Sequence, residues 1–179
     1  IFGKWHLGDE DAYQPGRRGF DEVFVHGAGG IGQTYPGTCG DAPGNTYFDP
    51  VVRHNGTFVK TRGYCTDVFT AHALRWMEGV KGRGPFFAYV AYNAPHEPLQ
   101  VRPEDEARYR GKVASEKAAR FLGMVANIDD NVGRILARLR EWGIDETTLV
   151  VVMNDNGGTV ALEVFDAGQE HDPEVVRFR

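Results

Sequence analysis

The sequence is poor in cysteine and has no long apolar run. Its two cysteines, Cys39 and Cys65, lack C-x-x-C spacing and a histidine partner at zinc-finger spacing, which excludes a small zinc-stabilised fold. One disulfide bond is the most that the two thiols could form. No apolar stretch approaches the roughly 20 residues that cross a bilayer, so no membrane span is expected.

An excess of positive charge is also lacking. The chain has 20 lysine and arginine residues against 25 aspartate and glutamate residues, and its formal net charge is −5. This balance offers no basic surface for nucleic acid. Because the net charge is negative, an anionic substrate would have to be held by a few local cations.

At 179 residues and 41% hydrophobic composition, the chain has the size and composition of one folded domain.

Several common catalytic motifs are missing. The chain has no HExxH, GxSxG or Walker sequence. The glycine-rich stretch GAGGIG at residues 27–32 is not followed by an amphipathic helix, so it does not predict a dinucleotide site. The chain also does not begin with methionine, and we therefore expect it to be an internal part of a longer protein.

The pattern of apolar residues predicts an α/β fold. Helical spacing over residues 66–80 and 115–142 predicts two amphipathic helices, and Gly143 is expected to end the second. Apolar runs at residues 85–92 and 147–153 predict two strands buried on both faces. Asn55-Gly56 predicts a hairpin between residues 51–54 and 57–60. The first 50 residues are expected to be mostly loop with short strands.

The first residues, GKWHLG at positions 3–8, place two cationic side chains around a tryptophan. If this stretch is extended, Lys4 and His6 share one face and Trp5 points to the other. Two donors on one face could bind an anion. Taken alone, the stretch is better explained by a surface lysine and a hydrogen-bonded histidine beside a core tryptophan.

Polar side chains follow both predicted buried strands. His96 comes after the strand at 85–92, and Asp155 and Asn156 come after the strand at 147–153. Open α/β sheets bind ligands beyond the carboxyl ends of their strands. The carboxylate and amide oxygens of Asp155 and Asn156 suit Ca²⁺ or Mg²⁺. The alternatives are a tight turn at NDNGG and a loop histidine bonded to backbone.

Six segments resemble, in the same order, the type I sulfatases of the alkaline phosphatase superfamily. They are GKWHLG at 3–8, GFDEVFVHGAGGIGQ at 19–33, YCTDVFT at 64–70, YNAPHEP at 92–98, MVANIDDNVGRIL at 124–136 and NDNGGT at 154–159. The resemblance extends to about Gly168 and implies an alkaline-phosphatase-like sandwich with a central, mostly parallel sheet and flanking helices. It also implies that residues 1–179 are a partial catalytic domain, without the nucleophile segment and the C-terminal subdomain.

The resemblance implies roles for individual residues in the hydrolysis of sulfate esters. Lys4, His6 and His96 would be catalytic, and Lys4 and His96 would also bind the substrate. Asp155 and Asn156 would hold Ca²⁺, with Mg²⁺ less favoured. The substrate would be a sulfated small molecule or carbohydrate, and the compartment would be the periplasm, the lysosome or the exterior.

The sequence also departs from the family. Neither cysteine lies in the C-x-[PA]-x-R motif that is converted to formylglycine, so we expect that nucleophile in an upstream segment. No lysine follows Lys117 to serve as the second sulfate-binding lysine, and His26 is only a weak candidate for the polar group that some members place near GIGQ. A phosphatase or phosphonate hydrolase of the same superfamily, and a non-catalytic product, are the alternatives.

Overall fold

The computed structural model describes residues 1–27, 29–32, 42 and 44–155, which form two compact units. The first unit comprises Ile1–Gln100 and the second Val101–Arg179. No helix in the described part of the chain is long and apolar enough to cross a membrane.

The first unit is built on a five-stranded mixed sheet in the order β4-β3-β2-β1-β5. Strands β2, β1 and β5 run parallel, and the hairpin strands β3 and β4 add an antiparallel half. The strands are β1 (Phe2–Lys4), β2 (Phe24–His26), β3 (Val51–His54), β4 (Thr57–Lys60) and β5 (Val90–Ala91). The three parallel strands therefore end at the same edge, as an α/β sheet requires.

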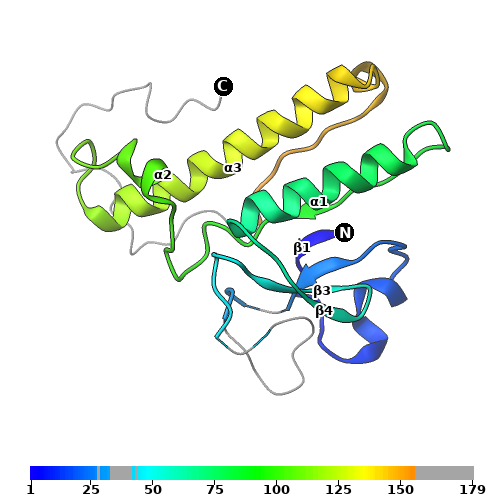
Figure 1. Ribbon diagram of the computed structural model, residues 1–179, viewed down its shortest axis with the longest axis horizontal. Coiled ribbons are helices and arrows are strands. Elements are labelled where there is room, and N and C mark those ends of the chain that lie inside the picture. Colours follow the sequence, from blue (N-terminus) through cyan, green and yellow to red (C-terminus); the bar gives the residue numbers. More distant parts are fainter. Residues whose placement is uncertain (28, 33–41, 43, 156–179) are drawn as a thin grey trace. The chain divides into compact units, whose positions relative to one another are not determined.

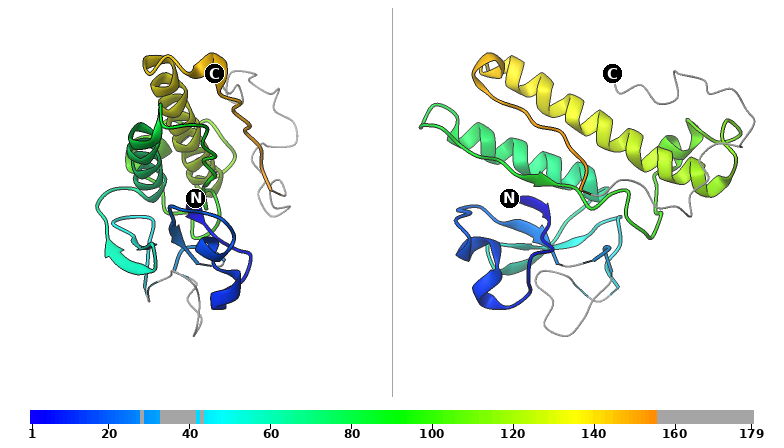
Figure 2. Two further views of the ribbon diagram at one scale, coloured as in Figure 1. Left: turned by 90° about the vertical axis from the view of Figure 1, so that its right-hand side faces the viewer. Right: turned by 180° about the vertical axis from the view of Figure 1, so that it is seen from behind.

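Helix α1 (Cys65–Val80) covers one face of this sheet, as Figures 1 and 2 show. Aromatic side chains carry the contact: the Phe2 ring lies 5.6 Å from Trp76, and the Phe24 ring lies 6.0 Å from Phe69. Because residues two apart in a strand share a face, Lys4 and His26 point to the same side as Phe2 and Phe24. The predicted helix over residues 66–80 is confirmed.

The opposite face of the sheet packs a second apolar cluster. Trp5, 5% exposed, lies there with Ile1, Val23 and Val25, and its indole N–H donates to the Tyr13 carbonyl at 3.0 Å. Two short 3₁₀ helices, Asp11–Tyr13 and Pro15–Arg17, lead into this cluster. The prediction that Trp5 of GKWHLG points into the packed core is confirmed.

The predicted hairpin is confirmed as strands β3 and β4. Its turn residues have positive φ angles, 47° at Asn55 and 91° at Gly56, as the Asn-Gly turn demands. Cys65 is a buried thiol, not part of a disulfide bond, and donates to the Asn93 side chain at 3.4 Å. The disulfide bond that the sequence allowed is therefore absent at Cys65, and Cys39 lies outside the described residues.

The expected strand at residues 85–92 is wrong in length and burial. Only Val90 and Ala91 pair with β1, and Phe87 is 73% exposed. Among the described residues, β5 is an edge strand, and α1 covers only one of its faces. Side chains along the run therefore alternate between half-buried and exposed, instead of being buried on both faces.

The second unit consists mainly of helices. Helix α3 (Glu116–Glu141) begins at Ser115, whose hydroxyl accepts from the Ala118 amide, and is followed by Gly143 with φ 67°. This confirms the predicted helix over residues 115–142. The short helix α2 (Pro103–Ala107) packs on α3 at Gly123, where a Cβ would lie 2.9 Å from the Glu106 amide nitrogen.

The expected strand at residues 147–153 is not formed in the described part of the chain. A 3₁₀ helix, η3 (Asp145–Thr147), occupies its start, and the following residues are extended but unpaired. Leu149 and Met153 are 89% and 82% exposed. An apolar run becomes a strand only when a neighbouring strand satisfies its backbone, and the described residues provide none here.

Gly3 permits the close pairing of β1 and β5. Its φ is 123°, and a Cβ would lie 2.0 Å from the Ala91 carbonyl oxygen.

We expect Gly3→Ala to lower the free energy of unfolding by at least about 2 kcal/mol, since it adds both backbone strain and overpacking. Gly79→Ala is the control, because that helical site is open; it should gain about 0.5–1 kcal/mol. Equal urea midpoints for the two variants would contradict this prediction.

His26, at the end of β2, is fully buried, and neither ring nitrogen has a hydrogen-bond partner in the described structure. Burial, together with the positive charges of Lys4, His6 and His96, lowers its pKa from 6.5 to about 3. The folded protein therefore holds His26 neutral in a range where the unfolded chain binds a proton.

This difference predicts acid sensitivity. Stability should fall as the pH drops below 6.5, towards about pH 3, with a contribution from His26 of up to about 1.4 kcal/mol per pH unit. Replacing the ring in His26→Leu should flatten this slope, measured by urea unfolding at a series of pH values. The same slope in both proteins would show that His26 is not the group responsible.

Candidate functional site

The carboxyl ends of the three parallel strands bring four cationic or imidazole side chains to one edge of the first unit. Lys4 ends β1 and lies in register with His26 at the end of β2. His6 follows β1 after Trp5, and His96 lies in the loop after β5. Lys4 is half-buried, whereas His6 and His96 are exposed. The predicted residues Lys4, His6 and His96 are thus gathered in one place.

The electrostatic effect of Lys4, His6 and His96 on the buried His26 indicates that these groups lie near one another. Lys4, His6 and His96 each act electrostatically on its ring and lower its pKa. The edge therefore combines a lysine and two histidines that water can reach with one neutral imidazole that it cannot. Positive charge that is focused at a partly buried edge attracts an anion.

Hydrogen bonds from the side chain of Tyr47 hold the backbone around His96. This fully buried side chain donates from its hydroxyl to the His96 carbonyl at 2.7 Å, and the Asn93 carbonyl lies 3.3 Å from the same hydroxyl. The His96 amide in turn donates to the Asn93 carbonyl at 2.9 Å. Burial raises the pKa of Tyr47 well above its ordinary value, so the hydroxyl keeps its proton and remains a donor.

The ring of His96 is oriented by its neighbour. Its Nδ1 lies 2.8 Å from the Glu97 carbonyl oxygen, which can only accept, so Nδ1 carries a hydrogen. The other nitrogen, Nε2, is therefore the one that can take up or give a proton. This fixed tautomer suits a general acid–base role.

Gly30 contributes to the site through its lack of a side chain, which the sequence analysis did not anticipate. A Cβ at this position would lie 2.7 Å from the His96 Nδ1 and 2.3 Å from the Glu97 carbonyl oxygen. The glycine-rich stretch thus lets the His96 loop approach. His26, only a weak candidate from the sequence, is the second residue that the structure brings into the cluster; its register with Lys4 was not visible in the sequence.

The two predicted metal ligands belong to the second unit. Asp155 is exposed and follows the extended run at residues 148–153, and Asn156 lies outside the described residues. The carboxylate and amide oxygens of this pair are hard ligands that fit Ca²⁺. Because Asn156 is outside the described residues, the fit to Ca²⁺ rests on the type of the two ligand groups and not on their positions.

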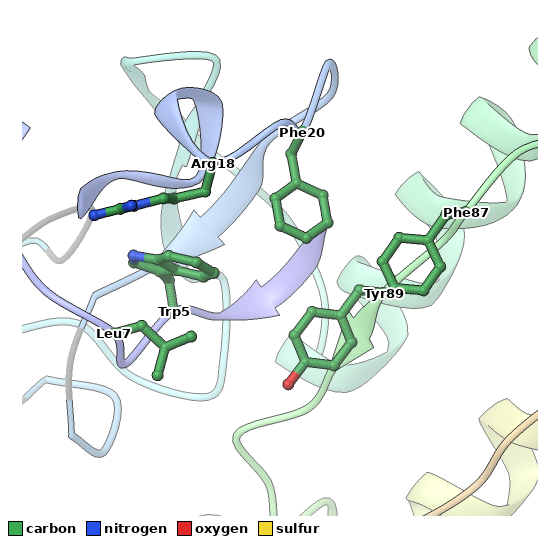
Figure 3. Close-up of a pocket in the computed structure, with 6 residues that line it drawn as sticks. All are labelled: Trp5, Leu7, Arg18, Phe20, Phe87 and Tyr89. Carbon is green, nitrogen blue, oxygen red and sulfur yellow. The ribbon is translucent and has the colours of Figure 1, made fainter. Parts of the chain in front are cut away.

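An open aromatic hollow of about 520 Å³ also lies in the first unit. Figure 3 shows Trp5, Phe20, Phe87 and Tyr89 around it, with Arg18 and Leu7 at one side. Trp5 points to the face opposite Lys4, and the hollow contains none of the clustered histidines. It is therefore separate from the edge that gathers Lys4, His6, His26 and His96.

Comparisons with known proteins agree with this geometry. The family model described as Sulfatase matches residues 1–174, slightly beyond the limit near Gly168 that the motifs indicated. Mouse arylsulfatase J is 30% identical over 161 residues, which cover 88% of this chain and 26% of that protein. Mouse N-acetylgalactosamine-6-sulfatase is 30% identical over 165 residues, 89% of this chain and 30% of that protein.

Solved structures give the same result. The crystal structure of Ps i-CgsB in complex with k-i-k-neocarrahexaose matches with a TM-score of 0.65 and 30% identity, covering 78% of this chain and 33% of that one. A glycosaminoglycan-metabolism protein of Bacteroides thetaiotaomicron shares the fold, with a TM-score of 0.59 at 16% identity. The chain thus spans about a third or less of these proteins and of the two mouse relatives. On the family match and the fold together, this chain belongs to the sulfatase family.

Proposed function

We propose that the protein hydrolyses sulfate esters and that Lys4, His6 and His96 bind and activate the sulfate group. Membership of the sulfatase family supports sulfate ester hydrolysis in general. The observation that carries the assignment of residues is the cluster at the carboxyl edge, where all three act on the buried His26. The cluster has the charge and exposure that a small oxyanion needs, and we therefore call the edge with Lys4, His6, His26 and His96 the anion-binding edge.

The chemistry of sulfate transfer explains why these residue types would be used. As the ester bond breaks, negative charge grows on the sulfuryl oxygens and on the departing oxygen. The ammonium of Lys4 and a protonated His6 would neutralise the sulfuryl oxygens. The Nε2 of His96 would give its proton to the departing oxygen, so that an alcohol leaves instead of an alkoxide. The buried His26 would stay neutral and would not compete for the anion.

Calcium and formylglycine belong to this proposal by family resemblance. Ca²⁺ would add a Lewis acid at the sulfate, and Asp155 with Asn156 would hold it. Formylglycine would supply the nucleophile from a segment outside these 179 residues, because neither cysteine of the chain lies in the required motif. The residues of this chain would bind the ester, orient it and protonate the leaving group.

The relatives suggest the class of substrate. Their names include an arylsulfatase and a sulfatase for N-acetylgalactosamine 6-sulfate, and one structural neighbour was solved with an oligosaccharide. We therefore propose an aryl sulfate or a sulfated carbohydrate as the substrate. 4-Nitrophenyl sulfate is the practical first probe, since the nitrophenolate that it releases is coloured.

The role of His96 predicts a dependence on the leaving group. In the full-length protein, His96→Ala should lower kcat for phenyl sulfate by about 10²–10⁴-fold. The loss should be much smaller for 4-nitrophenyl sulfate, because nitrophenolate leaves without protonation. Steady-state rates for both esters measure this difference. An equal loss for the two esters would contradict the assignment of His96 as the acid.

A separate comparison tests the alternative activity. If the wild-type protein hydrolyses 4-nitrophenyl phosphate faster than 4-nitrophenyl sulfate, a phosphatase is favoured over a sulfatase.

The role of Asp155 predicts a loss of calcium affinity. In the full-length protein, Asp155→Ala should weaken Ca²⁺ binding by about tenfold or more, because an anionic oxygen ligand is removed. Asp145→Ala is the matched control: it removes the same charge from η3, in the same unit, and should leave binding unchanged. Titration calorimetry measures both. Unchanged affinity in Asp155→Ala would remove this residue from the metal site.

A further inference from the structure

Three side chains from distant parts of the sequence converge in the first unit, away from the anion-binding edge. Glu22 precedes β2, His54 ends β3, and His72 lies in α1. The Nε2 atoms of His54 and His72 lie 2.7 Å and 2.9 Å from the same carboxylate oxygen, Oε1 of Glu22. One ligand atom from each residue lies within 4.8 Å of the other two. We call these three residues the Glu22 cluster.

The surroundings of the Glu22 cluster hold its side chains in place. The ring of Phe24 stacks on His72 at 3.9 Å with an interplanar angle of 8°, and the His54 ring meets His72 edge-on at 4.8 Å. Asn55 donates to the second carboxylate oxygen, Oε2 of Glu22, at 3.0 Å. This bond turns Oε1 towards the two imidazoles. Fixed ligands with an outer hydrogen bond are the arrangement that proteins use around metal ions.

We propose that the Glu22 cluster is a binding site for a divalent transition-metal ion of the zinc type. Two imidazole nitrogens and one carboxylate oxygen are ligands that Zn²⁺ accepts, with a fourth position open to water. The side chains of His54, Glu22 and His72 are 34%, 18% and 15% exposed, so the site is sheltered but reachable. Nothing in the proposed sulfate chemistry uses these three residues.

Binding of a metal ion would change the distances between the ligand atoms of the Glu22 cluster. Ligand atoms around tetrahedral zinc lie roughly 3.3 Å apart, given bonds of about 2.0–2.1 Å. The two nitrogen–oxygen distances in the cluster are shorter, because hydrogen bonds now join the atoms. Replacing these shared hydrogens with a metal ion would lengthen each nitrogen–oxygen distance by about half an ångström. The two Nε2 atoms, which lie within 4.8 Å of each other, would settle at roughly the same 3.3 Å separation. For each imidazole to bind the ion through Nε2, its ring hydrogen would move by exchange with solvent from Nε2 to Nδ1, so that the ring stays neutral.

The Glu22 cluster is distinct from the anion-binding edge. Phe24, at the start of β2, lies in register with His54, whereas His26, at the end of β2, lies in register with Lys4. The two groups therefore occupy opposite ends of the parallel strands. Their metal preferences also differ, because Ca²⁺ selects oxygen ligands and does not favour imidazole nitrogen.

The side chain of Arg75 opposes metal binding. Its Nη2 lies 3.3 Å from the His72 Nδ1, which must accept this hydrogen bond and so places the ring hydrogen on Nε2. Metal at Nε2 requires the hydrogen on Nδ1 instead. Arg75 is exposed and can swing aside, but its charge also repels the ion. Removal of Arg75 should consequently strengthen metal binding, whereas a purely structural cluster gives no reason for such a gain.

The test is a Zn²⁺ titration of the full chain by calorimetry at pH 7.5, with excess Ca²⁺ present throughout. Wild-type protein should bind one Zn²⁺ at the cluster. Glu22→Gln and His54→Gln should each weaken binding at least about tenfold. Asp21→Asn is the matched control, since it removes the same charge from the exposed neighbour of Glu22; its affinity should equal that of wild type. Arg75→Ala should bind severalfold tighter.

Thermal melting with and without Zn²⁺ separates a lost ligand from a lost fold. Zn²⁺ should raise the melting temperature of wild type, Asp21→Asn and Arg75→Ala, and should leave Glu22→Gln unchanged. Equal Zn²⁺ affinity in wild type, Glu22→Gln and His54→Gln would overturn the proposal. So would a wild-type melting temperature that Zn²⁺ does not raise.

Discussion

The parallel pairing of β1 between β2 and β5 is the constraint on which the rest of the first unit depends. β1 is only three residues long, yet it orders both faces of the sheet and fixes which side chains reach the edge. Phe2 packs towards α1, Trp5 packs on the opposite face, and Lys4 ends the strand beside His26. Gly3 makes this possible, because its missing side chain lets the Ala91 carbonyl come close. A side chain at this one position would disturb the packing and the anion-binding edge together.

The edge formed by the carboxyl ends of β1, β2 and β5 combines cationic groups that water can reach with a buried, neutral histidine. Lys4, His6 and His96 supply positive charge where an anion can arrive, and the fully buried His26 stays neutral behind them. A fourth charge at His26 would be costly without water or a partner, so burial and the neighbouring cations keep the proton off. Tyr47 and Gly30 fix the His96 loop without contributing charge. The site therefore depends as much on neutral supports as on cations.

The same short strands also separate two kinds of chemistry. At their carboxyl ends, the groups suit a small oxyanion; at the start of β2, the Glu22 cluster suits a transition-metal ion. The distance between these places is set by the length of β2 and by the antiparallel register that puts His54 beside Phe24. One end of the parallel strands thus gathers cationic side chains, while the other end joins the β3–β4 hairpin to α1 through Glu22, His54 and His72.

Local patterns in the sequence were enough to predict α1, α3 and the Asn55-Gly56 hairpin, because helical periodicity and turn chemistry are properties of neighbouring residues. The runs at 85–92 and 147–153 were predicted less well, since apolar composition does not say whether a partner strand or a covering helix is present. Phe87 and Leu149 are exposed for this reason.

The sequence by itself determined the family, through six motifs in order, and it named Lys4, His6 and His96. Only the tertiary structure decided that His26 is buried beside them and that Gly30 admits the His96 loop. It alone decided that Glu22, His54 and His72 meet. These contacts join residues far apart along the chain, and they depend on strand register and helix packing, which no local pattern encodes.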